Sequence, residues 1–242
     1  MQTAAIVLAA GAGTRMKSDK PKVAHEVLGK PLVGWVLDAA EAAGIDRVVT
    51  VVGHKREQVI PLVEDRAEVV VQEQQLGTAH AVLSCADALA GFEGSLLVLS
   101  GDCPLITAST MKALIDMREA NDAAVVVLTM NVPDPTGYGR IIRDEDGAVA
   151  RIVEQKDATP EEAAVTECNS GFYCFDAKAL FDALSQVGSD NAQGEFYLTD
   201  VLEISRNAGR AVLALPAKDP NECLGINTRE QLAAVEEIAR QR

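Results

Sequence analysis

A glycine turn followed by a short basic segment holds the residues whose types and spacing are best suited to chemistry. Gly11 and Gly13 lie in the turn, and Arg15 and Lys22 follow it. Glycine backbones reach conformations that bring amide groups close to an anion, and the two cations supply the charge that a polyphosphate needs. The apolar segment 4–8 precedes the turn and predicts a buried strand. The pattern therefore predicts a phosphate site at the carboxyl end of a strand, where open α/β sheets bind ligands.

The same turn also has a simpler interpretation. It lacks the third glycine of the dinucleotide fingerprint and the Gly-Lys-Ser/Thr of a Walker loop. An ordinary strand-to-helix turn would contain the same residue types, and a solvated surface loop would account for the charges. The segment 15–22 favours the phosphate interpretation, because it has four basic residues and one acidic residue in an acidic chain.

Composition disfavours two classes of partner. The 36 acidic and 22 basic residues give a net charge of −14, which disfavours general binding to nucleic acid or to an anionic membrane. The five cysteines form no C-x-x-C pair, which predicts unpaired thiols in a reducing compartment. No apolar run approaches the roughly 20 residues of a spanning helix, and no basic residue precedes the apolar start as in a signal sequence. We expect a soluble, cytoplasmic protein.

Apolar runs and amphipathic segments alternate through the first half of the chain, which is typical of a doubly wound, mostly parallel α/β sheet. After residue 130 the strands become shorter and predict a small antiparallel appendage beside that sheet. The predicted strands are 47–52, 69–71, 95–99, 123–130, 141–143, 149–153 and 170–175. The predicted helices are 31–43, 58–63, 78–90, 107–120 and 229–240.

The last of these helices has a recognisable start. Thr228 and Gln231 have the spacing of a capping box. We therefore expect a main domain over residues 1–227 and a C-terminal helix within residues 228–242.

Two further polar loops follow predicted strands and should reach the same edge of the sheet. The loop 71–78 contains three glutamines and opens a helix at Thr78, so it offers an amide side chain and a helix start that could read a base or a sugar, although a capped helix after a polar loop is the simpler interpretation. Asp102 follows another strand, and one carboxylate with phosphate oxygens and waters is a usual Mg²⁺ site. A turn aspartate is the alternative, although Pro104 and Thr107 fit the next helix start better.

Eight segments, in chain order, resemble those of one enzyme family. They are LAAGAGTRMKSDKPK, QEQQLGTAHA, GDCPLI, GYGRIIRD, IVEQKDAT, ECNSGFY, NAQGEFYLTD and GIN. The chain resembles, over nearly its whole length, the uridylyltransferase domain of the bacterial bifunctional N-acetylglucosamine-1-phosphate uridylyltransferase/glucosamine-1-phosphate acetyltransferase. The resemblance implies a Rossmann-like fold of the nucleotide-diphospho-sugar transferase type. It also implies a Mg²⁺-dependent transfer of UMP from UTP to N-acetyl-α-D-glucosamine 1-phosphate, releasing pyrophosphate, in peptidoglycan and lipopolysaccharide precursor synthesis.

The resemblance further implies roles for individual residues. Arg15 would contact the β- and γ-phosphates and Lys22 the phosphates near the reacting centre, and both would be catalytic together with Asp102. Asp102 and Asn227 would hold Mg²⁺, although Asn227 could instead cap the last helix. The implied nucleotide-binding residues are Leu8, Ala10, Gly11, Gly13, Arg15, Lys22, Gln72, Gly77 and Thr78. The implied sugar-phosphate residues are Gly139, Glu154, Asn169, Tyr197 and Thr199, of which Tyr197 taken singly fits a core position equally well.

The chain departs from the family pattern in two ways. Ser100 stands before Gly-Asp where some members carry tyrosine, and nothing resembles the hexapeptide repeats of the acetyltransferase domain. We therefore do not predict acetyl transfer. The trimer that those repeats would impose need not form, and a monomer is compatible with the sequence. The alternatives are a sister nucleotidyltransferase with another base or sugar phosphate, and a non-catalytic nucleotide-sugar sensor. The NAQGEFYLTD and GIN segments disfavour the first, and the joint retention of Arg15, Lys22, Asp102 and Asn227 disfavours the second.

Overall fold

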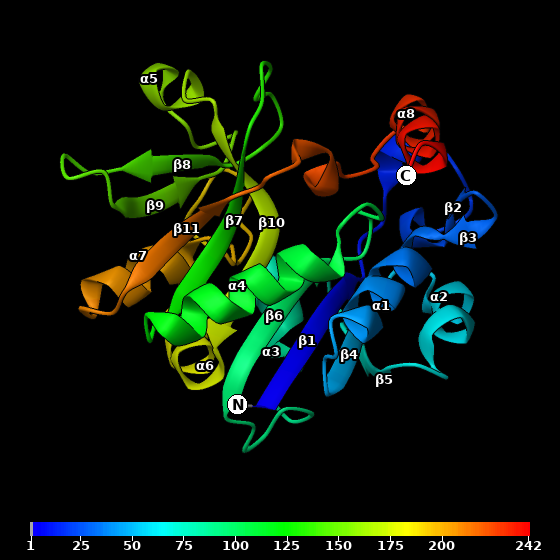
Figure 1. The fold of residues 1–242 in the computed structure, drawn as a ribbon, viewed down its shortest axis with the longest axis horizontal. Coiled ribbons are helices and arrows are strands. Elements are labelled where there is room, and N and C mark those ends of the chain that lie inside the picture. The colour runs from blue at the N-terminus through cyan, green and yellow to red at the C-terminus, as the bar shows by residue number, and fades with distance from the viewer. Residues whose placement is uncertain (1) are drawn as a thin grey trace.

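A sheet of nine strands, covered by helices on both faces, forms the body of the protein in the computed structural model, which describes residues 2–242 (Figure 1). The central strand β1 (Gln2–Ala9) pairs in parallel with β4 (Arg47–Val52) on one side and with β6 (Gly94–Ser100) on the other. β5 (Glu68–Val71) continues the parallel order beyond β4. These four strands confirm the predicted doubly wound half.

One long strand runs against its neighbours. β10 (Glu167–Asp176) lies between β6 and β7 (Val125–Asn131) and is antiparallel to both, whereas β11 (Val212–Pro216) pairs in parallel with β7 at the edge. β8 (Arg140–Arg143) and β9 (Val149–Val153) form the predicted antiparallel appendage. β8 joins it to the main sheet by pairing with the first residues of β10. The fold class is confirmed, with β11, β7, β10, β6, β1, β4 and β5 in that order across the sheet.

The prediction for strand 170–175 was wrong in one respect, because that strand belongs to the main sheet and not to the appendage. Its residues alternate between the two cores: Phe172 and Cys174 pack on one face, and Tyr173 and Phe175 on the other. A strand buried on both faces must lie inside a sheet.

Helices form a layer on each face of the sheet. α1 (Leu32–Ala42), α2 (Arg56–Val63) and α4 (Ala108–Ala120) pack on the face that includes Val7, and Figure 1 shows α1 and α4 in front of the strands. Packed on the opposite face, which includes Ile6, are the helices α3 (Thr78–Leu83), α6 (Ala177–Leu184) and α7 (Asp200–Asn207).

α3 is shorter than the predicted helix 78–90. The chain after Leu83 continues in turns, with backbone bonds from Cys85 to Val82 and from Ala86 to Leu83. The Ser84 hydroxyl also donates to the carbonyl of His80 (2.9 Å), a local bond that competes with regular helix. The sequence patterns did not predict α6, α7 or β11, nor the short elements η1 (Thr14–Met16), η2 (Lys22–Ala24), β2 (Glu26–Val27), β3 (Lys30–Pro31), α5 (Pro160–Ala163) and η3 (Pro220–Cys223).

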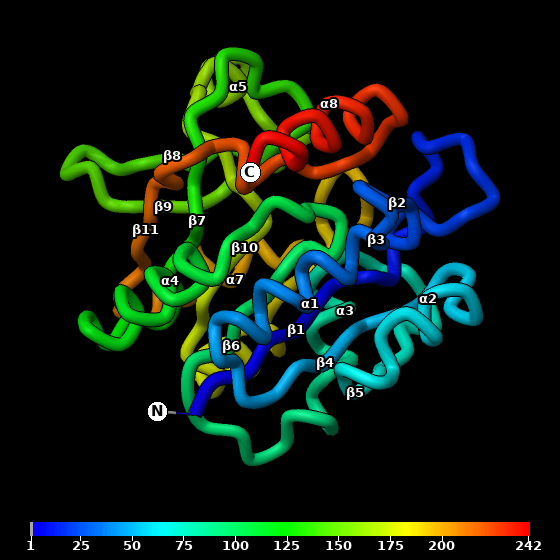
Figure 2. Tube along the Cα trace, turned by 45° about the vertical axis from the view of Figure 1, so that its right-hand side comes forward, coloured from blue at the N-terminus to red at the C-terminus, as the bar shows by residue number. Residues whose placement is uncertain are grey.

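The last helix, α8 (Arg229–Arg240), begins with the capping box between Thr228 and Gln231 that the sequence predicts. Its buried Val235 joins Met16 in a small third core, so α8 packs against the chain that follows β1. Figures 1 and 2 show α8 beside β2.

All five cysteines are buried and unpaired, as predicted. Within residues 2–242, no helix is long and apolar enough to cross a membrane.

Candidate functional site

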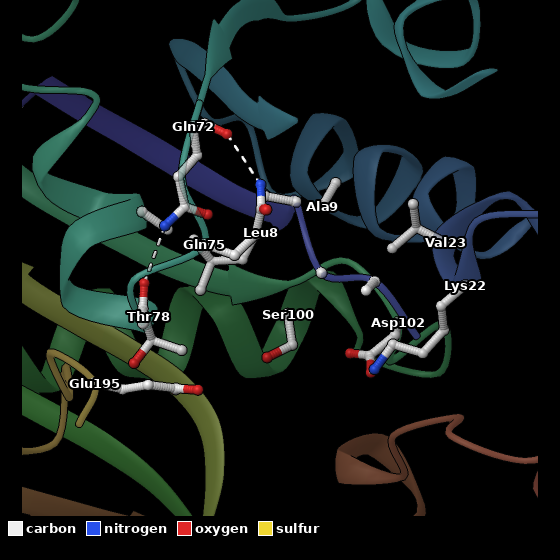
Figure 3. Close-up of a pocket in the computed structure, with 15 residues that line it drawn as sticks. Leu8, Ala9, Lys22, Val23, Gln72, Gln75, Thr78, Ser100, Asp102 and Glu195 are labelled. Carbon is white, nitrogen blue, oxygen red and sulfur yellow. Dashed lines mark hydrogen bonds and ion pairs between the residues drawn. The ribbon is translucent and has the colours of Figure 1, made fainter. Parts of the chain in front are cut away.

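The register of the parallel strands brings the predicted loops to one edge of the sheet. Leu8 lies opposite Val51 of β4 and Ser100 of β6, and Val52 lies opposite Val71 of β5. The segments that follow these strands enclose a pocket of about 450 Å³ (Figure 3). Eight residues predicted from the sequence line it: Leu8, Ala10, Gly11, Lys22, Gln72, Gly77, Thr78 and Asp102.

Two predicted nucleotide residues, Gly13 and Arg15, do not line this pocket. Gly13 has a positive φ of 60°, and a Cβ atom there would lie 2.7 Å from the Cβ of Lys22. The glycine therefore lets the turn pass close to Lys22. Arg15 is exposed in η1 and has no ion-pair partner among residues 2–242, so its contact with phosphates stays a prediction.

Lys22 connects the two predicted metal ligands. Its ammonium forms an ion pair with the Asp102 carboxylate and donates to Oδ1 of Asn227 (3.0 Å). The Lys22 and Asp102 side chains are only 19% and 16% exposed. The backbone NH of Ile226 donates to the carbonyl of Asp102 (3.1 Å), which holds the two distant segments together. The carboxylate and the amide oxygen therefore face one common cation.

This donor set fits Mg²⁺. Among residues 2–242, no group of three or more His, Cys, Asp or Glu side chains could hold a metal ion. A site on Asp102 and Asn227 would thus offer one carboxylate and one amide oxygen, and substrate phosphates and waters would supply the other ligands. Mg²⁺ is usually bound in this way, because it dehydrates reluctantly and seldom receives an all-protein cage.

The other end of the pocket contains the buried amide of Gln72, which is 3% exposed. Its Nε2 donates to the carbonyl of Gly77 (3.1 Å) and lies 3.0 Å from Nδ1 of His80. The residues around Gly77 are fixed by the chain after β10, because the Phe196 NH donates to Leu76 and the Phe196 carbonyl accepts from Ala79. The structure thus brings the predicted base-reading residues together.

The predicted sugar-phosphate residues form a second group. A Cβ atom on Gly139 would lie 3.4 Å from Oε1 of Glu154 and 3.5 Å from Cβ of Asn169, and the Thr199 hydroxyl donates to Glu154 (3.2 Å). Burial, with carboxylates nearby, raises the pKa of Glu154 despite the Thr199 hydrogen bond. Glu154 also lines a separate cavity of about 300 Å³ together with Tyr197.

Tyr197 is 7% exposed, which agrees with the core interpretation of this residue. Its hydroxyl donates to Oδ2 of Asp157 (3.1 Å) and accepts from Nε2 of Gln193 (2.8 Å). Burial raises the pKa of the Tyr197 hydroxyl to about 12. A contact between Tyr197 and a sugar stays a prediction.

Ser100 lines the pocket at the position where the family pattern differs. Its hydroxyl donates to the carbonyl of Gly171 (3.3 Å), and a Cβ atom on Gly171 would lie 2.9 Å from that hydroxyl oxygen. The serine thus packs closely against β10.

Sequence reasoning did not assign the other lining residues, which are Ala9, Ala12, Val23, Gln75, Ala81 and Glu195. Glu195 lies in the NAQGEFYLTD segment, and the resemblance of this segment to the family could have indicated that Glu195 lies at the site.

A comparison with protein families defines the class of this chain. The family model of the MobA-like NTP transferase domain matches residues 5–208, and the chain belongs to this family. Among curated relatives, the bifunctional protein GlmU of Pelotomaculum thermopropionicum is 51% identical over 242 residues, which are 100% of this chain and 53% of the relative. The bifunctional protein GlmU of Lactobacillus johnsonii is 53% identical over 237 residues, which are 98% of this chain and 51% of the relative.

The chain spans about half the length of the curated relatives it matches. A solved structure of UDP-glucose pyrophosphorylase complexed with UDP-glucose has a TM-score of 0.75 and 21% identity, and the match covers 100% of this chain and 99% of that one. This similarity shows a shared fold.

The close approach at Gly77 gives a prediction about stability. Gly77 has a φ of 119°, and a Cβ atom there would lie 2.4 Å from the carbonyl oxygen of Phe196. Gly91 also has a positive φ of 73° but has open space around it. We expect Gly91→Ala to lower the free energy of unfolding by about 1–2 kcal/mol, and Gly77→Ala to lower it by about 3 kcal/mol or more. Urea unfolding of the two variants measures the difference, and equal losses would contradict the steric role of Gly77.

Proposed function

We propose that this chain is a uridylyltransferase that transfers UMP from UTP to N-acetylglucosamine 1-phosphate and releases pyrophosphate. The observation that carries the proposal is the convergence of Lys22, Asp102 and Asn227 at the end of a pocket whose other end holds Gln72. Relatives named bifunctional protein GlmU, aligned over the whole chain at about half identity, support the same activity.

The proposed reaction is an in-line displacement. An oxygen of the sugar phosphate attacks the α-phosphorus of UTP and forms a new P–O bond, while the bond to the β-phosphate breaks and pyrophosphate leaves. Such a reaction needs no covalent intermediate on the protein, so positioning and charge neutralisation account for the rate. The ammonium of Lys22 would neutralise phosphates near the reacting centre. Mg²⁺ held by Asp102 and Asn227 would supply further positive charge at the phosphate oxygens.

The two ends of the site would hold the two substrates. Gln72, Gly77 and Thr78, with the backbone at Ala10 and Gly11, would read uracil, and Arg15 would reach the β- and γ-phosphates from the exposed turn. Glu154, Asn169, Gly139 and Thr199 would accept from and donate to the hydroxyl and acetamido groups of the sugar. The close grouping of Glu154, Gly139 and Thr199 supports this assignment.

A substrate panel tests the proposal directly. The purified protein is incubated with Mg²⁺, each nucleoside triphosphate and several sugar 1-phosphates, while pyrophosphate release is followed. We expect release with UTP and N-acetylglucosamine 1-phosphate. Release only with CTP or dTTP, or only with another sugar phosphate, would indicate a sister nucleotidyltransferase, and binding without turnover would indicate a sensor.

Asp102 gives a second prediction. Asp102→Asn keeps the side-chain shape but removes the charge that would attract the metal, so we expect kcat to fall about a hundredfold or more. Because the change also removes the ion pair with Lys22, activity is measured well below the unfolding temperature of the variant. Asp38→Asn is the matched control, because Asp38 forms ion pairs with Lys30 and Arg66 (2.9 Å) and does not line the pocket. An Asp102→Asn protein that turns over as fast as the Asp38→Asn protein would rule out the metal assignment.

The raised pKa of Glu154 gives a prediction about pH. Because burial favours its neutral form, this carboxyl takes up a proton at higher pH than an ordinary glutamate and then loses part of its capacity to accept sugar hydroxyls. We expect the KM for the sugar phosphate to rise as pH falls through that raised pKa. The substrate phosphate itself titrates near pH 6, so Glu154→Gln, which cannot ionise, serves as the reference. Identical KM profiles for the two proteins would exclude Glu154 from sugar binding.

A further inference from the structure

The orientation of the Gln72 amide is fixed by two acceptors. Its nitrogen has two N–H bonds, and both have a partner within hydrogen-bond distance: the carbonyl of Gly77 at 3.1 Å and Nδ1 of His80 at 3.0 Å. A flipped amide would place the Gln72 oxygen against the Gly77 carbonyl oxygen, which is repulsive. His80 can accept at Nδ1 when its ring proton is on Nε2, and the hydrogen-bond network selects that tautomer.

In this orientation only the amide oxygen of Gln72, which is an acceptor, is left to bind a ligand. Figure 3 shows the amide nitrogen of Gln72 directed to the Gly77 carbonyl and the amide oxygen turned toward the pocket. An oxygen at this place accepts from the N3–H of a uracil-type base. The N3 atom of cytosine is itself an acceptor, so cytosine would leave two lone pairs facing each other in a buried place, and a buried mismatch of this kind is costly.

We propose that His80 is a positioning residue for base selection, which acts by holding the Gln72 amide so that its oxygen faces the base. The inference rests on the proposed function, because it assumes that a nucleoside triphosphate occupies this pocket. His80 is not among the residues that line the pocket, and it instead lines a separate, outer cavity of about 220 Å³ together with Leu83, whose side chain is exposed. Its effect must therefore pass through Gln72.

Equilibrium binding of UTP and of CTP, without sugar phosphate, tests this role. His80→Phe keeps a flat ring and removes the acceptor, whereas His80→Asn can place its side-chain oxygen near the position of Nδ1. We expect the preference for UTP over CTP to fall about tenfold in His80→Phe, and to stay within about twofold of the wild type in His80→Asn. Leu83→Ala is the matched control, because it alters the same helix and the same outer cavity without touching Gln72.

Three results would overturn the role of His80. The first is an unchanged UTP preference in His80→Phe, and the second is an equal loss in His80→Phe and His80→Asn, which would assign the effect to ring packing. The third is an equal loss in Leu83→Ala. If His80→Phe does not fold, His80→Leu makes the same deletion with a smaller side chain.

The outcome for the proposed function is separate. A wild-type protein that binds UTP in preference to CTP but releases no pyrophosphate with any sugar phosphate would exclude the transferase activity and leave the role of His80 in place. A protein that turns over UTP, but whose base preference does not depend on His80, would support the transferase activity and exclude the role of His80.

Discussion

The parallel register of β1 with β4 and β6 is the constraint on which the pocket depends. Leu8 lies opposite Val51 and Ser100, so the loops after three strands reach one edge at the same height. A shift of one residue would exchange the faces of β1 and move Ile6 and Val7 into the wrong cores. Both residues are fully buried, on opposite faces of the sheet. The hydrophobic cores therefore position the polar groups of the pocket, although those groups contribute little to the cores themselves.

The antiparallel strand β10 extends this constraint to the sugar side. It pairs with β6, which leads to Asp102, and its own regular pairing with β7 is interrupted between Asn169 and Tyr173. The Asn169 side chain closes that irregular segment, because it accepts from the NH of Gly171 (3.0 Å) and donates to the Tyr173 hydroxyl (2.7 Å). Asp102, which follows β6, and Asn169, which lies in β10, are thus carried by neighbouring strands of one sheet, which fixes their separation.

Sequence patterns could predict the elements whose signals are local. The sequence predicts β1 from its apolar residues, α4 from its amphipathic pattern and α8 from its capping box. It also predicts that Asp102 follows a buried strand. The position of β10 was not predictable, because an apolar strand carries no mark of the strand it will pair with. The contact between Lys22 and Asn227 joins residues 205 positions apart and was not predicted, because the family resemblance indicated only that Asn227 lies near Asp102. The bond between Gln72 and His80 was missed, because a glutamine and a histidine in a polar loop have many other possible partners.

The charges of the two ends give the site a direction. Burial raises the pKa of Glu154, and the nearby carboxylates of Asp157, Asp200 and Glu195 raise it further, whereas Lys22 lies beside Asp102 and Asn227. A substrate with phosphates at one end and a neutral sugar at the other is repelled from the carboxylates and attracted to the ammonium. Its phosphate is therefore directed toward the place where the α-phosphate of a bound nucleotide would lie. Because the net charge of the whole chain is −14, the positive charge for the phosphates has to come from a few residues, and Lys22 is the one that the fold partly buries beside Asp102 and Asn227.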